Sequence, residues 1–230
     1  MQTKCTPQKS DISLETIFEN NPRGPSLSNK NILIITCALY AIFSGWYTHL
    51  GGPMTNQEID QAMVGLTKNG MKQEDLQKWE KFMRTDTGNQ FIMLNAIDMN
   101  PSPPKMPKTR QGAGPEELMN IYMEHMYAEQ FKRASHPVFF GHAVHTVLDI
   151  AGIDNATSWT HGALFRYRSR ADLIEIALHP SSYERHEYKI AALTKTIAYP
   201  IEPTIYLSDL RLLVLLIMSL IYVSIVAIRR

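Results

Sequence analysis

Two apolar stretches without charged residues, one near each end of this 230-residue chain, constrain its fold more than any other feature. Residues 31–50 read NILIITCALYAIFSGWYTHL and residues 212–228 read LLVLLIMSLIYVSIVAI. As helices they would reach about 30 Å and about 25 Å, close to the hydrocarbon thickness of a bilayer. Arg211 and Arg229 flank the second stretch and can snorkel to lengthen it. We therefore predict transmembrane helices over residues 31–50 and 208–228.

The alternatives for these stretches are a buried core helix and, for the first stretch, a cleaved signal peptide. A core helix normally shows polar residues at every turn, and neither stretch has that pattern. About 30 residues precede the first stretch, which is long for a signal sequence, and no clear A-x-A site follows it. We therefore expect the first stretch to be an uncleaved signal anchor.

Lysine and arginine near the two stretches predict the orientation in the membrane. Arg23 and Lys30 precede the first stretch, residues 51–67 contain neither Lys nor Arg, and two arginines end the chain. Both stretches therefore place the termini in the cytoplasm, including a tail at residues 1–30. The central region is then extracytoplasmic, or periplasmic, at a cell (inner) membrane, with the lipid bilayer as a partner.

The composition of the whole chain excludes some classes of partner and of cross-link. The formal net charge is +1, so we expect no nucleic-acid partner. The two cysteines, Cys5 and Cys37, lie in the tail and in the first apolar stretch. The central region is therefore expected to fold without a disulfide.

Residues 53–84 predict a helical hairpin next to the membrane. Its two helices, expected over 55–69 and 73–84, carry apolar side chains at helical spacing. The stripe of Met and aromatic residues on the second helix favours packing onto the rest of the chain or within the hairpin. A groove for a protein partner is the alternative.

Residues 85–203 predict an α+β domain with ferredoxin-like topology, because the expected order is strand, helix, strand, strand, helix, strand. The strands are expected at 90–99, 137–147, 161–168 and 196–201, and the helices at 116–134, 169–178 and 183–194. That order gives an antiparallel sheet with helices on one face, while the other face still carries apolar side chains. We therefore expect a homodimer that closes a barrel, or docking as a subunit of a larger membrane complex.

Four segments of this region resemble one family in their order and spacing. They are residues 86–95 (DTGNQFIMLN), 137–141 (PVFFG), 165–173 (FRYRSRADL) and 189–200 (KIAALTKTIAYP). These segments are similar to the DUF1330-like branch of the dimeric α/β-barrel superfamily. The resemblance implies the fold and dimerisation but little chemistry, although relatives in the superfamily include small monooxygenases, isomerases and haem enzymes. The apolar stretches, the hairpin and the Pro-rich loop after the first strand depart from the soluble members.

Asn95, His142 and Arg166 are the candidates for acid–base chemistry, because each is expected within a strand among apolar neighbours. The ordinary alternatives are a barrel-lining histidine at His142 and, for Arg166, an ion pair with an acid across a dimer. Arg166, Arg168 and Arg170 are also candidate ligands for an anion such as a lipid phosphate. Salt bridges within the domain are the alternative for these arginines.

No metal ion and no other cofactor is expected. His142 and His145 are three residues apart, and on a strand that spacing points them to opposite faces, so they would not bind one ion. Zinc usually needs three or four converging ligands, and the central region offers no cysteine.

These features support three hypotheses of function, and whether the chain is an enzyme is left open. The first is a structural or accessory component of a membrane assembly, which acts by dimerisation or docking. The second is a small-ligand-binding protein or a cofactor-independent enzyme, monooxygenase- or isomerase-like, that uses the barrel cavity. The third is an extracytoplasmic ligand sensor, although the tail at residues 1–30 has no recognisable output domain.

Overall fold

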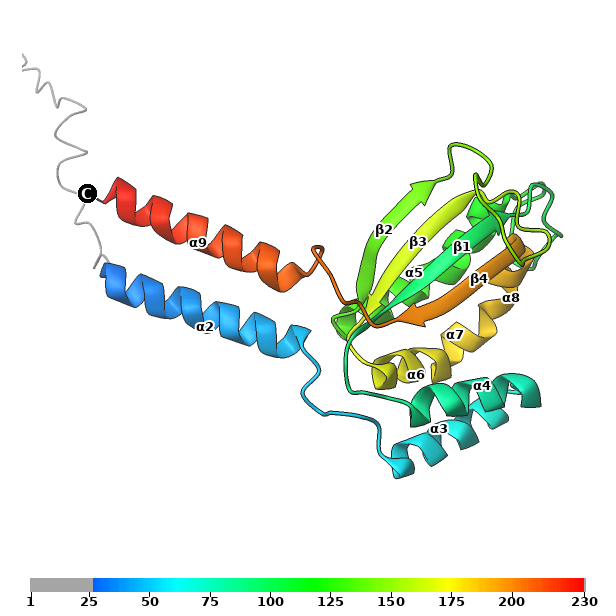
Figure 1. The fold of residues 1–230 in the computed structure, drawn as a ribbon, viewed down its shortest axis with the longest axis horizontal. Coiled ribbons are helices and arrows are strands. Elements are labelled where there is room, and N and C mark those ends of the chain that lie inside the picture. Colours follow the sequence, from blue (N-terminus) through cyan, green and yellow to red (C-terminus); the bar gives the residue numbers. More distant parts are fainter. Residues whose placement is uncertain (1–26, 230) are drawn as a thin grey trace, which may run out of the picture.

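The structure, a computed structural model, describes residues 27–229 (Figure 1). Most of the predicted tail lies outside the described residues, as do Arg23 and Arg230, which contribute to the predicted orientation. The helices are α2 (Asn29–Tyr47), α3 (Asn56–Lys68), α4 (Gln73–Arg84), α5 (Pro115–Lys132), α6 (Arg170–Leu178), α7 (Pro180–Glu184), α8 (His186–Ala191) and α9 (Leu210–Ile228).

Four strands form one antiparallel sheet in the spatial order β2-β3-β1-β4. The strands are β1 (Phe91–Met99), β2 (His136–His142), β3 (His161–Tyr167) and β4 (Leu193–Ile201). With α5 between β1 and β2, and α6 to α8 between β3 and β4, this order is the ferredoxin-like α+β fold. The fold class predicted for this part of the sequence is therefore confirmed.

Two predicted elements differ from the structure. Strand β2 ends at His142 and not at residue 147, because regular pairing with β3 ends opposite, at His161. Beyond it, Ala143 and Val147 donate single hydrogen bonds to the carbonyls of Thr160 and Thr157, each at 2.9 Å, without continuing the ladder. The single helix predicted at 183–194 is wrong. It is replaced by two short helices, α7 and α8, which meet at Arg185, and by the first residues of β4.

Helices α5 and α6 cover one face of the sheet, and the main core lies between these helices and the strands (Figure 1). Phe91 of β1 and Tyr167 of β3 stack there with ring centroids 5.3 Å apart. Met126 of α5 and Leu173 and Ile176 of α6 pack against these rings. Burial of one such apolar side chain contributes about 1.5–3 kcal/mol, so this cluster is a large part of what holds the sheet to its helices.

The hairpin of α3 and α4 packs against α6, so its apolar stripe is used within the chain. A capping box starts α3, in which Thr55 and Glu58 each bond the other's backbone N–H group. The buried cluster consists of Ile59, Ala62, Leu66, Leu76, Met83 and Ile174. Ile174 belongs to α6, so the hairpin shares a core with the α+β domain.

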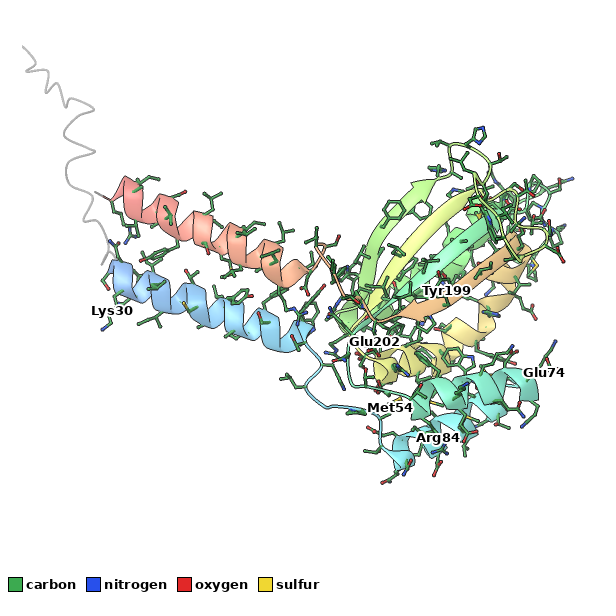
Figure 2. The ribbon with its side chains drawn as sticks, in the orientation of Figure 1. Lys30, Met54, Glu74, Arg84, Tyr199 and Glu202 are labelled. Carbon is green, nitrogen blue, oxygen red and sulfur yellow. The ribbon has the colours of Figure 1, made fainter. Side chains whose placement is uncertain are left out.

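Helices α2 and α9 contact each other and extend together away from one end of the sheet (Figure 1). Each has 19 residues and is long and apolar enough to cross a membrane, with mean hydropathies of 1.2 and 2.5. Figure 2 shows their side chains projecting with little cover. Helix α2 ends at Tyr47 and not at residue 50, because the carbonyl of Tyr47 is turned into the domain, where Arg166 binds it.

Candidate functional site

The face of the sheet opposite the helices is apolar, and the described residues leave most of it uncovered. We call it the open face. Strand register assigns to it Ile92, Leu94, Ala96, Phe139, Leu164, Ile197, Tyr199 and Ile201. Phe139 of β2 is 54% exposed. Tyr199 of β4, labelled in Figure 2, is 47% exposed. The ring of Phe139 lies against Gly141, where an added Cβ would come within 3.0 Å of it, so a larger residue at position 141 would displace this ring.

The structure does not bring Asn95, His142 and Arg166 together. Asn95 pairs with Ala163 on the helix-covered side of the sheet, and its side-chain amide donates to the Met93 carbonyl at 3.0 Å. His142 is exposed at the end of β2, where its ring centroid lies 4.4 Å from that of His161. Arg166 is on the open-face side. These three side chains therefore do not form one site within the domain.

Arg166 is fully buried at the end of the open face that adjoins α2 and α9. Its guanidinium carbon lies 3.6 Å from the ring centroid of Tyr47, and its Nη2 donates to the Tyr47 carbonyl at 2.8 Å. It also donates to Gln90 Oε1 at 2.7 Å and to the carbonyl of Ala134. All of these acceptors are uncharged, and burial lowers the pKa of the guanidinium. The charge is therefore used to join three segments of the chain.

His136 completes the contact between α2 and the sheet. Its Nδ1–H donates to the Pro137 carbonyl at 3.0 Å, so its Nε2 accepts from the Tyr47 hydroxyl at 2.7 Å. Burial lowers the pKa of this imidazole, and the nearby charge of Arg166 lowers it further. The ring is therefore neutral at neutral pH, which is the state that this hydrogen-bond pattern requires.

The start of α9 is fixed to the same place. Asp209 caps the helix, and Arg211 forms an ion pair with it at 2.5 Å while donating to Thr48 Oγ1 at 3.0 Å. We call the polar contacts among Tyr47, Thr48, Gln90, His136, Arg166, Asp209 and Arg211 the junction. A shallow pocket of about 300 Å³ adjoins it, lined by His136, Pro137, Val138, Leu207, Ser208, Asp209, Leu210 and Leu213. The junction thus ties both apolar helices to one end of the sheet.

Arg168 and Arg170, the other members of the predicted anion site, are occupied within the domain. Arg168 pairs with Asp172 at 2.7 Å and donates to the Trp46 carbonyl at 3.1 Å. Arg170 pairs with Glu202 at 3.0 Å and lies 3.5 Å from Asp86. These ion pairs match the salt-bridge alternative that the sequence left open.

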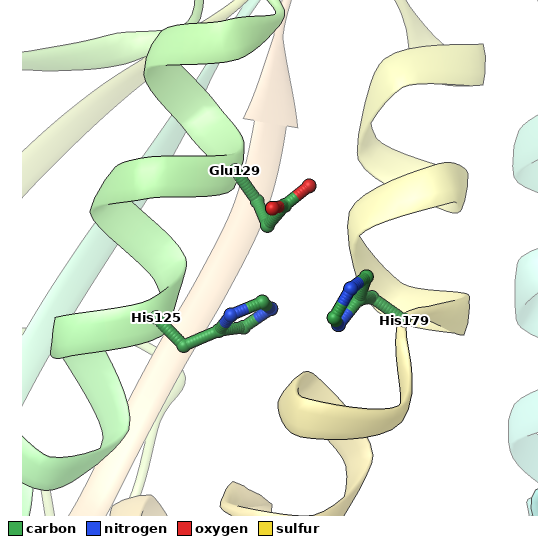
Figure 3. Close-up of side chains that lie close together, drawn as sticks. All are labelled: His125, Glu129 and His179. Carbon is green, nitrogen blue, oxygen red and sulfur yellow. The ribbon is translucent and has the colours of Figure 1, made fainter.

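A group of possible metal ligands occurs on the helical side of the domain. His125 and Glu129 of α5 face His179, which lies between α6 and α7 (Figure 3). One ligand atom from each residue lies within 4.8 Å of the others. The sequence interpretation missed this group because it considered only the pair His142 and His145. The spacing of His125 and Glu129, four residues apart in a predicted helix, was the available signal.

Comparison with known proteins gives a likeness of fold only. No family model matches the chain, and no curated protein matches it. A protein of unknown function from Rhodopseudomonas palustris is 18% identical over 59% of this chain and 96% of its own, with a TM-score of 0.47. A dimeric ferredoxin-like protein of unknown function from Jannaschia is 15% identical over 50% and 100%, with a TM-score of 0.31. SnoaB, a cofactor-independent oxygenase from Streptomyces nogalater, is 9% identical over 52% and 97%, with a TM-score of 0.32.

Proposed function

We propose that this chain is a two-span membrane protein whose ferredoxin-like domain is fixed close to the bilayer and pairs with a second copy through the open face. Its role is then that of a structural or accessory component of a membrane assembly. The observation that carries the proposal is the apolar open face, which is joined to two uncovered apolar helices by the buried junction. The proposed segments are a tail at 1–30, spans at 31–50 and 208–228, a hairpin at 53–84 and a domain at 85–203.

The exposure of α2 and α9 supports the spans. In the most apolar 18-residue stretch of each helix, only 6% of the residues of α2 and none of those of α9 are buried. A core helix would be mostly buried. Ile42 of α2 is 70% exposed and Leu220 of α9 is 68% exposed. Apolar surface left in water costs about 25 cal/mol per Å², and a bilayer removes that cost.

The positions of the basic residues support cytoplasmic termini. Lys30 lies at the end of α2 far from the sheet, as Figure 2 shows, and Arg229 lies at the far end of α9. Arg229 donates to the Leu27 carbonyl at 2.5 Å, so the two far ends lie together. Because Lys and Arg favour the cytoplasmic side, the domain is proposed to be extracytoplasmic, or periplasmic, at a cell (inner) membrane.

The shape of the open face supports a second copy as its partner. It carries apolar side chains on all four strands, so two copies related by a two-fold axis can meet with the same residues on both sides. The junction sits at one end of this face, so two copies held by parallel spans would be positioned at the same height above the bilayer. Docking to a different subunit of a larger complex is the alternative partner.

The pocket beside the junction supports a second candidate function, the binding of a small ligand. At about 300 Å³ it is at the lower limit for a ligand site, and its lining combines His136 and Asp209 with apolar side chains.

A cofactor-independent enzyme at Asn95, His142 and Arg166 has less support, because these residues lie apart. A sensor role has no supporting observation in the described residues. Membership of the DUF1330-like branch is proposed on the four sequence segments alone.

The orientation is tested with single cysteines in a chain whose own cysteines are replaced. A cysteine at Lys105, in the exposed loop after β1, should react in intact cells with a maleimide that does not cross membranes. A cysteine at Lys30 should react only after the membrane is opened. The reverse pattern, or equal labelling at both positions, would contradict the proposed orientation.

The oligomeric state is tested by native mass spectrometry of the full chain released from a mild detergent. The expected mass is that of two copies of this chain. A mass that includes a different protein would replace the homodimer by the docking alternative. A monomer at every concentration tested would overturn both.

A further inference from the structure

We propose that His125, Glu129 and His179 bind one divalent transition-metal ion, with zinc as the first candidate. The group lies on the helical side of the domain, away from the open face and the junction. The proposal is therefore independent of the proposed function. Two imidazoles and one carboxylate form a donor set that proteins use for zinc and for other first-row metals.

The chain positions these ligands from two separate segments. His125 and Glu129 are four residues apart on α5, so they project from the same side of that helix (Figure 3). His179 ends α6 and caps α7, with Pro180 fixing the first turn of the second helix. An ion held by all three would clamp α5 to the turn between α6 and α7.

The distances are those of a site that closes with small side-chain movements. The ligand atoms lie within 4.8 Å of one another, and the ring centroids of His125 and His179 are 4.3 Å apart. Ligand atoms about 2 Å from a tetrahedral zinc ion are roughly 3.3 Å apart. Movements of about 1 Å at the tips of the side chains would therefore bring the three atoms to these separations.

His125 has an unused ligand atom. Its Nε2 is buried and has no hydrogen-bond partner among residues 27–229. Buried ring nitrogens usually have a partner, so this one calls for an explanation.

Glu129 supplies the negative charge, and its position is already fixed. It is 5% exposed and forms ion pairs with Lys132 at 2.5 Å and Arg133 at 2.6 Å. The charges of Lys132 and Arg133 weaken the attraction of this carboxylate for a metal ion. Arg133 also pairs with Glu175 at 2.8 Å, so its charge is partly balanced by a second carboxylate.

His179 would lose one weak contact on binding. Its Nδ1 accepts from the N–H group of Ser181 at 3.3 Å, which is long for such a bond. If Nδ1 binds the ion, its lone pair is used, and if Nε2 binds, Nδ1 carries the proton. Either mode removes only this contact. Three protein ligands would leave one position of a tetrahedral ion open to water or to a substrate, as in catalytic zinc sites.

The test is a titration of the full chain in mild detergent with Co²⁺, whose visible absorption reports tetrahedral coordination, followed by displacement with Zn²⁺. We expect one ion for each chain. The variants are His125→Gln, Glu129→Gln and His179→Asn, because Gln keeps the helix and Asn keeps the cap of α7. His145→Gln is the matched control, since that exposed histidine lies in the loop after β2.

The two histidine variants should weaken binding by more than the roughly 10- to 100-fold that loss of a supporting partner costs, while the control binds as the wild type does. Circular dichroism and thermal melting verify that each variant is folded. A wild-type chain that binds no Co²⁺ or Zn²⁺ would overturn the proposal. Folded His125→Gln and His179→Asn that bind the ion as tightly as the wild type does would also overturn it.

Discussion

The two faces of the sheet are built from the same strands but have different surroundings. On one face, Phe91 and Tyr167 are at most 5% exposed under α5 and α6. On the other, Phe139 and Tyr199 are about half exposed although they are as apolar as their counterparts. Only the end of the open face next to the apolar helices is covered, by the junction around Arg166. The comparison teaches that the domain completes its core on one face and leaves apolar side chains exposed on the other, which is the basis of the proposed association.

The largest expected effect is on the covered face. Phe91→Ala removes a fully packed ring and leaves a cavity, which should lower the free energy of unfolding by about 3–5 kcal/mol. Phe139→Ala, the matched change on the open face, should cost less than about 1 kcal/mol in a monomer. Pulse proteolysis of the full chain in urea and mild detergent measures both, at a concentration low enough that the chain is monomeric by light scattering. Equal losses would break the distinction between the two faces.

The next effect is at the covered end of the open face. Arg166→Ala leaves the carbonyls of Tyr47 and Ala134 without their donor, so we expect a loss of about 2–4 kcal/mol in the free energy of unfolding. Arg110→Ala, which removes an exposed ion pair with Glu117, should change it by less than about 1 kcal/mol. The same proteolysis assay compares them. A small loss for Arg166→Ala would mean that the junction does not fix the helices to the sheet.

A smaller effect is expected on association rather than on folding. Tyr199→Glu places a charge on the open face and should weaken the homodimer by about tenfold or more, since an unpaired charge in an interface is costly. Val64→Glu is the control, because Val64 is 71% exposed on α3, away from that face. Light scattering across a dilution series gives the dissociation constants. The open face is not the dimer interface if both variants dissociate at the wild-type concentration.

The smallest effect is that of pH on the junction. The pKa of His136 is lowered in the folded protein, so the unfolded chain binds the proton more readily. Its contribution to stability is therefore complete above the unfolded pKa of about 6.5 and is lost as pH falls below it, by at most about 1.4 kcal/mol per pH unit. Melting temperatures between pH 7.5 and 5 should fall less steeply for His136→Gln than for the wild type. Parallel slopes would remove His136 as the source.

The predicted fold agrees with the structure where the information is local. Strand β1 was predicted at 90–99 and is found at Phe91–Met99, because its β-forming residues follow a Thr-Gly turn and precede a Pro-rich loop. The limit of β2 was wrong because a strand ends where its neighbour ends, and that neighbour is 19 residues away at His161. Breaks such as Arg185, between α7 and α8, have no strong local signal.

The candidate site was less predictable. Arg166 lies within a strand, as predicted, and it was a candidate for acid–base chemistry or anion binding, with an ion pair across a dimer as the alternative. In the structure its partners are Tyr47, Gln90 and Ala134 of the same chain. Arg168 and Arg170 form the ion pairs that were given as their alternative. His142, expected within a strand, lies at the strand's end. Two of the three possible metal ligands, His125 and Glu129, have a helical spacing that the sequence shows, while nothing in the sequence links His179 to them.

The sequence by itself determined two apolar helices and the order of strands and helices, because both depend on the spacing of side chains along a short stretch of chain. Only the tertiary structure decided that Arg166 meets Tyr47, 119 residues earlier, and that His179 faces His125. Those contacts form when separate elements pack, and their distances depend on how α2, α5 and the α6–α7 turn lie against the sheet. The open face itself was predicted from topology, but its covered end was not, because the cover comes from the ends of α2 and α9.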